Sequence, residues 1–197
     1  MTTPVTSRDR AKAERSDAIL RAAARLFAER GYNGVSLEDI GAAVGVSGPA
    51  VYRHFAGKQA LLGAVLVKVS ADLVDGGTRV ASADDSEEKV MHALIDFHVQ
   101  FALGHADVIR VHDRDVAQLA ADDHAEVRRL QRAYVELWID TLAPLVDADR
   151  DELRLRVQAC FGLINSTPHS TRAASRGRSA TATVLVAMAE SALRAST

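Results

Sequence analysis

The sequence predicts an all-α protein of about nine helices, and three observations lead to this prediction. Glycine and proline are scarce, with 12 and 4 residues in a chain of 197, whereas alanine and leucine, which favour helix, are abundant. Apolar residues recur at helical spacing in one segment after another, and we find no segment with the alternation of a strand. The composition, 48% hydrophobic and 25% charged, is typical of a globular protein.

The first third of the chain is expected to contain three helices. The first covers about residues 12–30, where apolar residues lie on one face. Ser36 is a candidate N-cap of a second, short helix, which Gly45 ends. Ser47 then opens a third helix with Pro49 in its first turn, where a missing N–H costs nothing.

Longer helices are expected in the rest of the chain. The first of them begins at about Lys58 and should end at Asp75-Gly76-Gly77, before a polar loop. Pro168 and a basic stretch separate the last two helices. We therefore expect a domain of residues 1–57 and a larger helical-bundle domain of residues 58–197. The further helices are expected at 86–104, 106–120, about 123–143, roughly 149–167 and 179–195.

Charge is distributed unevenly along the chain. Residues 1–58 hold nine Lys/Arg against six Asp/Glu, whereas the remainder holds 15 against 20. A basic first domain is the sign expected of a part that contacts a polyanion. A solvated charged helix face would give the same pattern, so charge alone does not decide.

Cellular location is predicted from the apolar runs and the cysteine count. No apolar run approaches the roughly 20 residues of a membrane span, and the first residues are polar, unlike a signal peptide. The single cysteine, Cys160, cannot form an internal disulfide and is expected to be a small buried residue. We expect a cytoplasmic protein that does not bind a membrane.

The two short helices joined at Gly45 predict a helix-turn-helix. Apolar residues on both helices would fix the crossing angle, so that the second helix presents an exposed face. A major groove of DNA is wide enough for one helix. An ordinary helical hairpin would show the same helix-Gly-helix pattern, so the pattern leaves both alternatives open.

A family resemblance favours DNA binding. Residues 19–62, ILRAAARLFAERGYNGVSLEDIGAAVGVSGPAVYRHFAGKQALL, resemble the N-terminal domain of the TetR/AcrR family of bacterial transcriptional regulators. The similarity includes A-x-x-L-F-x-x-x-G-Y from Ala23, I-x-x-x-x-G-V-S from Ile40 and Y-x-x-F-x-x-K from Tyr52. The resemblance implies a homodimeric repressor that binds a pseudo-palindromic double-stranded DNA operator and responds to a small-molecule effector.

The resemblance also implies DNA contacts at eight positions. Gly48, Pro49 and Ala50 would face base edges, although none of them has a hydrogen-bonding side chain. Arg53 would be the chief sequence reader, because arginine bidentate to guanine is the commonest specific contact. Phosphate contacts are implied for Ser36, Tyr52, His54 and Lys58.

The larger domain is expected to bind the effector and to dimerise. FALGHADVIRVHDRDVAQLA and FGLINSTPHSTR look similar to a branch of the family associated with lipids and acyl-CoA, which implies a largely apolar effector. The candidate effector contacts are Phe97, Phe101, Arg110, Trp138, Phe161 and Asn165, with His98 and His112 as further polar anchors. The candidate dimer stripe is Leu153, Val157, Val184, Leu185, Met188 and Ala192, with Ala180, Ala182, Ala187 and Ala189 permitting close approach.

Other function classes have less support. The chain has no Gly-rich phosphate loop and no nucleophile elbow, so we expect no enzyme, no catalytic residues and no cofactor. His98, His105 and His112 recur every seven residues, but Gly104 interrupts their helix, so we expect no metal site. The alternatives are a helical binding or structural protein without a DNA role, and a regulator acting as an activator or metal sensor.

Overall fold

The structure, a computed structural model, describes residues 6–167 and 177–195, and within these ranges it is all helical. This confirms the predicted fold class; Pro168 and most of the basic stretch after it lie outside the described residues. The elements are α1 (Ser7–Arg30), α2 (Leu37–Ala43), α3 (Gly48–Tyr52), α4 (Lys58–Ala81), α5 (Glu87–Gly104), α6 (Ala106–Asp115), the 3-10 helix η1 (Val116–Gln118), α7 (Ala121–Leu142), α8 (Arg150–Asn165) and α9 (Arg178–Leu193).

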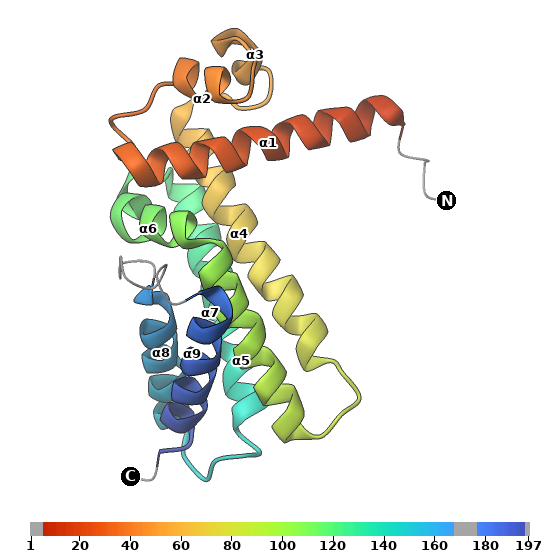
Figure 1. The fold of residues 1–197 in the computed structure, drawn as a ribbon, viewed down its shortest axis with the longest axis vertical. Helices are drawn as coiled ribbons and strands as arrows, with labels where there is room; N and C mark the ends of the chain where they lie inside the picture. The colour runs from red at the N-terminus through yellow and green to blue at the C-terminus, as the bar shows by residue number, and fades with distance from the viewer. Residues whose placement is uncertain (1–5, 168–176, 196–197) are drawn as a thin grey trace.

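The helices form an elongated bundle with the three N-terminal helices at one end (Figure 1). Helix α4 runs from α2 and α3 down along the bundle and packs against α1, α5 and α7. Helices α5, α7, α8 and α9 form the lower body, and α6 lies directly beneath α1. The arrangement makes α4 and α6 the elements that join the two ends of the molecule.

Helix α1 begins at Ser7, earlier than the predicted start near residue 12. Thr6 caps it, because its hydroxyl accepts a hydrogen bond from the Asp9 N–H at 3.2 Å while the Asp9 carboxylate accepts one from the Thr6 N–H. The basic residues Arg8 and Arg10 are therefore exposed on a helix, the first turns of which extend beyond the rest of the fold (Figure 1).

The prediction that α4 ends at Gly76-Gly77 is wrong, because the helix continues to Ala81. Both glycines are buried where neighbouring helices approach closely. A Cβ on Gly77 would lie 2.6 Å from the Tyr134 ring of α7, and a Cβ on Gly76 would overlap the Phe97 ring of α5. The glycines therefore allow close helix packing instead of ending the helix.

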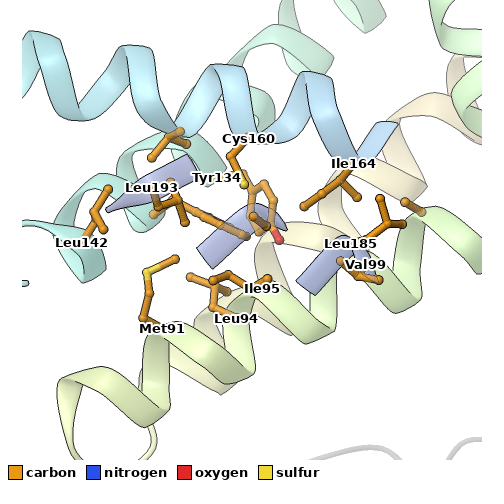
Figure 2. Packing of buried hydrophobic residues seen from close by; sticks show 14 of the residues in the cluster. Met91, Leu94, Ile95, Val99, Tyr134, Leu142, Cys160, Ile164, Leu185 and Leu193 are labelled. Carbon is orange, nitrogen blue, oxygen red and sulfur yellow. The ribbon is translucent and has the colours of Figure 1, made fainter. Parts of the chain in front are cut away.

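Two hydrophobic cores hold the fold together. The first surrounds Phe27 and Ile40 in the N-terminal helices and also takes in Val111 of α6. The second fills the lower body around Trp138, and Figure 2 shows Tyr134 and Cys160 packed within it. The prediction that Cys160 is a small buried residue is confirmed, and burial raises the pKa of its thiol to about 12.

The predicted dimer stripe is only partly exposed. Leu153, Val157 and Leu185 were expected on the dimer stripe but are buried in the protomer's own core, whereas Val184 and Met188 are exposed.

Among the helices in the described ranges, none is long and apolar enough to cross a membrane.

Candidate DNA-binding and effector sites

The segment from α2 to α3 forms a helix-turn-helix. Gly45 makes the turn with φ of +70°, a conformation that favours glycine. Gly41, which the sequence analysis did not single out, lets the turn fold back: its carbonyl accepts a hydrogen bond from the Val46 N–H at 2.9 Å, and a Cβ there would lie 2.8 Å from the Val46 oxygen. The turn therefore depends on two glycines, Gly45 within it and Gly41 in the helix against which it packs.

The surface of α3 carries two of the four predicted base-contact residues. Pro49 is exposed and Ala50 is half-buried, so both reach the surface. Gly48 differs from them: it is buried, and a Cβ there would lie 3.0 Å from a carboxylate oxygen of Glu38. In this conformation Gly48 therefore packs against α2 and presents no surface to a base edge.

The polar residues of this segment lie at and beyond the end of the helix. Helix α3 ends at Tyr52, which is 56% exposed. Arg53 is the C-cap residue and is exposed, and His54 is half-buried in the following turn. Because α3 is so short, Arg53 and His54 lie beyond its last residue, where the chain turns towards α4.

Two of the predicted phosphate ligands are engaged within the protein. The Ser36 hydroxyl donates to the Asp39 carboxylate at 2.7 Å and its N–H donates to the same carboxylate at 2.9 Å, which lowers the pKa of Asp39. The Lys58 ammonium donates to the Tyr32 carbonyl at 2.9 Å and lies 4.5 Å above the Tyr32 ring centre. Both residues thus also stabilise the helix-turn-helix.

A cavity of about 660 Å³ opens between α4, α5, α6, α7 and α8. This volume lies in the range of small-molecule sites. Of the predicted effector contacts, Phe101, Phe161 and Asn165 line it, and so do His98 and His112. The other lining residues are Val69, Ser70, Leu73, Val108, Ile109, Asp113, Arg128, Leu130, Gln131, Arg132, Tyr134, Val135, Glu136, Arg154 and Gln158.

The remaining three predicted contacts lie outside the cavity lining. Phe97 is turned towards α4, where it packs over Gly76. Trp138 is fully buried behind the lining, with its ring centre 4.9 Å from that of Phe161. Arg110 pairs with Asp107 on α6 at 3.4 Å.

The inner wall of the cavity is aromatic and includes a buried histidine. His98 is 2% exposed and stacks on Phe161 with ring centres 4.5 Å apart. Its Nδ1 lies 3.3 Å from the hydroxyl of Tyr134, while its Nε2 has no hydrogen-bond partner among the described residues. Burial lowers the pKa of His98 to about 4, although Asn165 partly offsets this effect, so the imidazole is neutral at pH 7.

Helix α6 connects the cavity to the helix-turn-helix end. Its residues Ile109 and His112 line the cavity. Arg114 lies in the last turn of the same helix. Its guanidinium donates to the carbonyl oxygens of Phe27 and Ala28 in the last turn of α1. The Phe27 carbonyl already accepts from the Gly31 N–H at 2.8 Å, so Arg114 adds a second hydrogen bond there, and its positive charge suits the C-terminal end of α1.

The Arg114 contact is held from the other side by a carboxylate. Asp115 is buried and accepts hydrogen bonds from Arg114 at 2.9 and 3.2 Å, which raises the pKa of the guanidinium. Sequence reasoning did not find Arg114, because nothing in a run of alternating charges shows which arginine meets a distant helix end.

The three histidines considered for a metal site belong to different parts of the fold. His98 belongs to α5, His105 precedes α6 and bonds the Phe101 carbonyl at 3.0 Å, and His112 contacts Gln131 at 2.7 Å. In residues 6–167 and 177–195, no group of three or more His, Cys, Asp or Glu side chains is placed to hold a metal ion.

Comparison with protein families gives two matches that together span most of the chain. Residues 19–65 match the family model of bacterial regulatory proteins, tetR family. Residues 83–194, more than half of the chain, match the model of the tetracyclin repressor-like C-terminal domain. The first match covers the helix-turn-helix, and the second covers most of the cavity wall.

Individual relatives agree with the family matches. The transcriptional repressor KstR2 of Rhodococcus jostii is 23% identical over 168 residues, covering 85% of this chain and 82% of that protein. The regulator EthR of Mycobacterium tuberculosis is 29% identical over 140 residues, covering 70% of this chain and 62% of that protein.

Solved structures share the fold. The TetR family regulator PfmR from Thermus thermophilus superposes with a TM-score of 0.76 at 20% identity, covering 98% of this chain and 99% of that one. FadR from Bacillus subtilis, solved in complex with stearoyl-CoA, superposes with a TM-score of 0.67 at 17% identity, covering 90% and 95% of the two chains.

Proposed function

The chain belongs to the TetR family of bacterial regulatory proteins, and from this premise we propose that it is a homodimeric repressor released from its operator by a small, largely apolar effector. The relatives KstR2 and EthR are both helix-turn-helix-type transcriptional regulators. In this proposal residues 1–57 bind DNA, residues 58–197 bind the effector and dimerise, and the protein works in the cytoplasm, where its operator lies.

The proposed DNA contact uses the exposed surface around α3. Pro49 and Ala50 supply apolar contacts to thymine methyl groups, and Arg53 supplies the long hydrogen-bond donor. Tyr52 and His54 lie beside the phosphates. Because Ser36 and Lys58 already have partners within the protein, their phosphate contacts require them to share or exchange those partners.

The proposed dimer uses the outward faces of α8 and α9. Leu155 on α8 is 66% exposed, and Val184 and Met188 on α9 are 45% and 50% exposed. The same two helices carry small exposed residues such as Gly162 and Ala187, which allow helices of two protomers to approach closely. To read a pseudo-palindromic operator, the two α3 helices of such a dimer must lie about one DNA turn apart.

The proposed effector occupies the cavity between α4 and α8. Aromatic and aliphatic side chains form its inner wall, which suits an apolar molecule. FadR of Bacillus subtilis binds stearoyl-CoA within a similar fold, which supports a lipid-related or acyl-CoA effector here.

A single observation carries the repressor proposal: α6 both lines the cavity and holds the end of α1 through Arg114. An effector that displaces Ile109 or His112 shifts α6, and Arg114 transmits the shift to α1 and thereby to the helix-turn-helix. The effector must bind the displaced conformation more tightly than the DNA-binding one, because only differential affinity moves the equilibrium.

The test is fluorescence anisotropy with DNA from upstream of the chain's own gene, at several salt concentrations. We expect binding that weakens with salt, and a loss of roughly tenfold or more in Arg53→Ala, because a good arginine–guanine pair contributes about 1–3 kcal/mol. Arg129→Ala is the matched control, since Arg129 is exposed on α7 and pairs with Glu126 of the same helix at 2.7 Å.

The alternatives predict other outcomes of the same experiment. A helical binding protein without a DNA role would bind the fragment no better than unrelated DNA, and Arg53→Ala would behave like wild type. An activator would bind DNA more tightly with effector than without it. A metal sensor would change its DNA affinity on adding Zn²⁺, which the arrangement of the histidines gives no reason to expect.

A further inference from the structure

The inner end of the cavity contains polar groups without partners in an otherwise aromatic wall. His98 from α5, Tyr134 from α7 and Asn165 from α8 all line the cavity. Two atoms there, Nε2 of His98 and Oδ1 of Asn165, are buried and make no hydrogen bond with any described residue. A buried polar atom left unpaired costs about 1–3 kcal/mol, so such a pair requires an explanation.

The neighbours of His98 determine which ring nitrogen carries the proton. Burial raises the pKa of Tyr134, so its hydroxyl stays protonated and can donate to Nδ1 of His98. The indole N–H of Trp138 can only donate; it lowers the pKa of the same hydroxyl, although Nε1 makes no hydrogen bond of acceptable geometry with any described residue. The tyrosine proton is therefore directed to His98, whose Nδ1 accepts and whose Nε2 carries the ring proton.

The two unpaired atoms thus have opposite character. The Nε2–H of His98 is a donor, and Oδ1 of Asn165 is an acceptor. Asn165 raises the pKa of His98 as a weak hydrogen-bond acceptor would, so the two side chains face each other, but Nε2 and Oδ1 do not reach the geometry of a hydrogen bond. One ligand group placed between them must accept from the histidine and donate to the asparagine.

We propose that the inner end of the cavity binds an uncharged group that both accepts and donates a hydrogen bond, namely the hydroxyl or amide end of an otherwise apolar effector. This inference rests on the proposed function, because it takes the cavity to be the effector site. It narrows the effector class to apolar alcohols and amides, and to larger molecules that insert such an end first.

The distribution of charge along the cavity supports an uncharged inner group. The charged lining residues are exposed or half-buried at the cavity mouth, and they are Asp113, Arg128, Arg132, Glu136 and Arg154. None of them pairs with His98 or Asn165. A carboxylate pushed to the inner end would lose its water without gaining a cation, which makes that position unfavourable for an anion.

The experiment compares decyl probes that differ only in their polar end. Decanol and decanamide both accept and donate, decyl methyl ether only accepts, and decanoate is an anion. Binding is followed by calorimetry and by the fluorescence of Trp138, which is the chain's single tryptophan and lies behind the cavity wall. The full chain is used at about pH 7.5, where His98 is neutral.

We expect decanol and decanamide to bind roughly tenfold more tightly than the ether, and decanoate to bind more weakly than the ether. His98→Phe keeps an aromatic ring in the stack but removes the N–H, so it should abolish the preference for decanol over the ether. Asn165→Leu should do the same by removing the acceptor. If one variant fails to fold, as checked by its thermal melting, the other still decides.

Three results would overturn the inference: decanoate binding tightest, the ether binding as well as decanol, or both variants keeping the wild-type preference. The operator assay separates this failure from that of the proposed function. A decanol preference without DNA binding removes only the repressor proposal. Release from DNA by ligands that show no such preference removes only the uncharged-end inference.

Discussion

Acidification should destabilise the fold through His98. The imidazole is fully buried among aromatic rings, and its pKa is about 4 in the folded protein against 6.5 for the free side chain. Between these two values the unfolded chain binds a proton that the folded protein does not bind. The free energy of unfolding therefore falls as the pH falls through this window and is unaffected by His98 above it.

The size of the effect follows from the two pKa values. One pKa unit corresponds to about 1.4 kcal/mol, so the full effect approaches about 3 kcal/mol, and at about pH 5 it is about 2 kcal/mol. Urea unfolding followed by Trp138 fluorescence, at fixed protomer concentration, measures the loss between about pH 7.5 and pH 5.

The control for this prediction is His98→Phe, which removes the titrating group and keeps the ring stacking. Subtracting the variant's loss from that of wild type isolates the histidine from all other titrating groups. An equal loss in both proteins, or no loss in wild type, would refute the reasoning that the folded cavity keeps His98 neutral.

Three further predictions concern packing, the turn and assembly. Gly76→Ala should lower the free energy of unfolding by about 1–3 kcal/mol, because the added Cβ would overlap the Phe97 ring. In the control Gly104→Ala, the added Cβ would lie 3.9 Å from its nearest neighbour, so urea unfolding should detect no loss. Gly45→Ala, at φ of +70°, should cost about 1–2 kcal/mol in the same assay, and a loss below a few tenths would contradict the observed turn. Val184→Glu should yield a monomer in sedimentation velocity while Lys89→Glu, exposed on α5, stays dimeric; an unchanged dimer would remove α9 from the interface.

Much of the helical architecture was predictable because its signals are local. The Ser36 cap and the Gly45 turn depend on residues within a few positions of one another, and the structure contains both. The earlier start of α1 also has a local signal, since Thr6 and Asp9 form a capping box that the sequence analysis overlooked.

The predictions were wrong where residues distant in sequence determine the local structure. Gly76 and Gly77 resemble a helix end in sequence, but rings from α5 and α7 occupy the space where their side chains would lie. Trp138 has the residue type of a ligand contact, yet its face of α7 points into the second core. Neither outcome can be read from spacing along one helix.

The candidate sites show the same division. The helix-turn-helix residues were found from a compact motif, except that Gly48 packs against Glu38 instead of facing outward. Residue type correctly placed Phe101, Phe161 and Asn165 in the lining of one cavity, but the contact between Arg114 and α1 joins residues more than 80 positions apart and required the structure.

The coupling between cavity and DNA is tested most directly by measuring operator affinity with and without saturating decanol, in wild type and in Arg114→Ala. We predict that decanol weakens DNA binding of wild type at least tenfold, and that Arg114→Ala loses most of this response while Trp138 fluorescence shows that the alcohol still binds. The account would be contradicted if decanol changed Trp138 fluorescence in wild type and left its operator affinity unchanged.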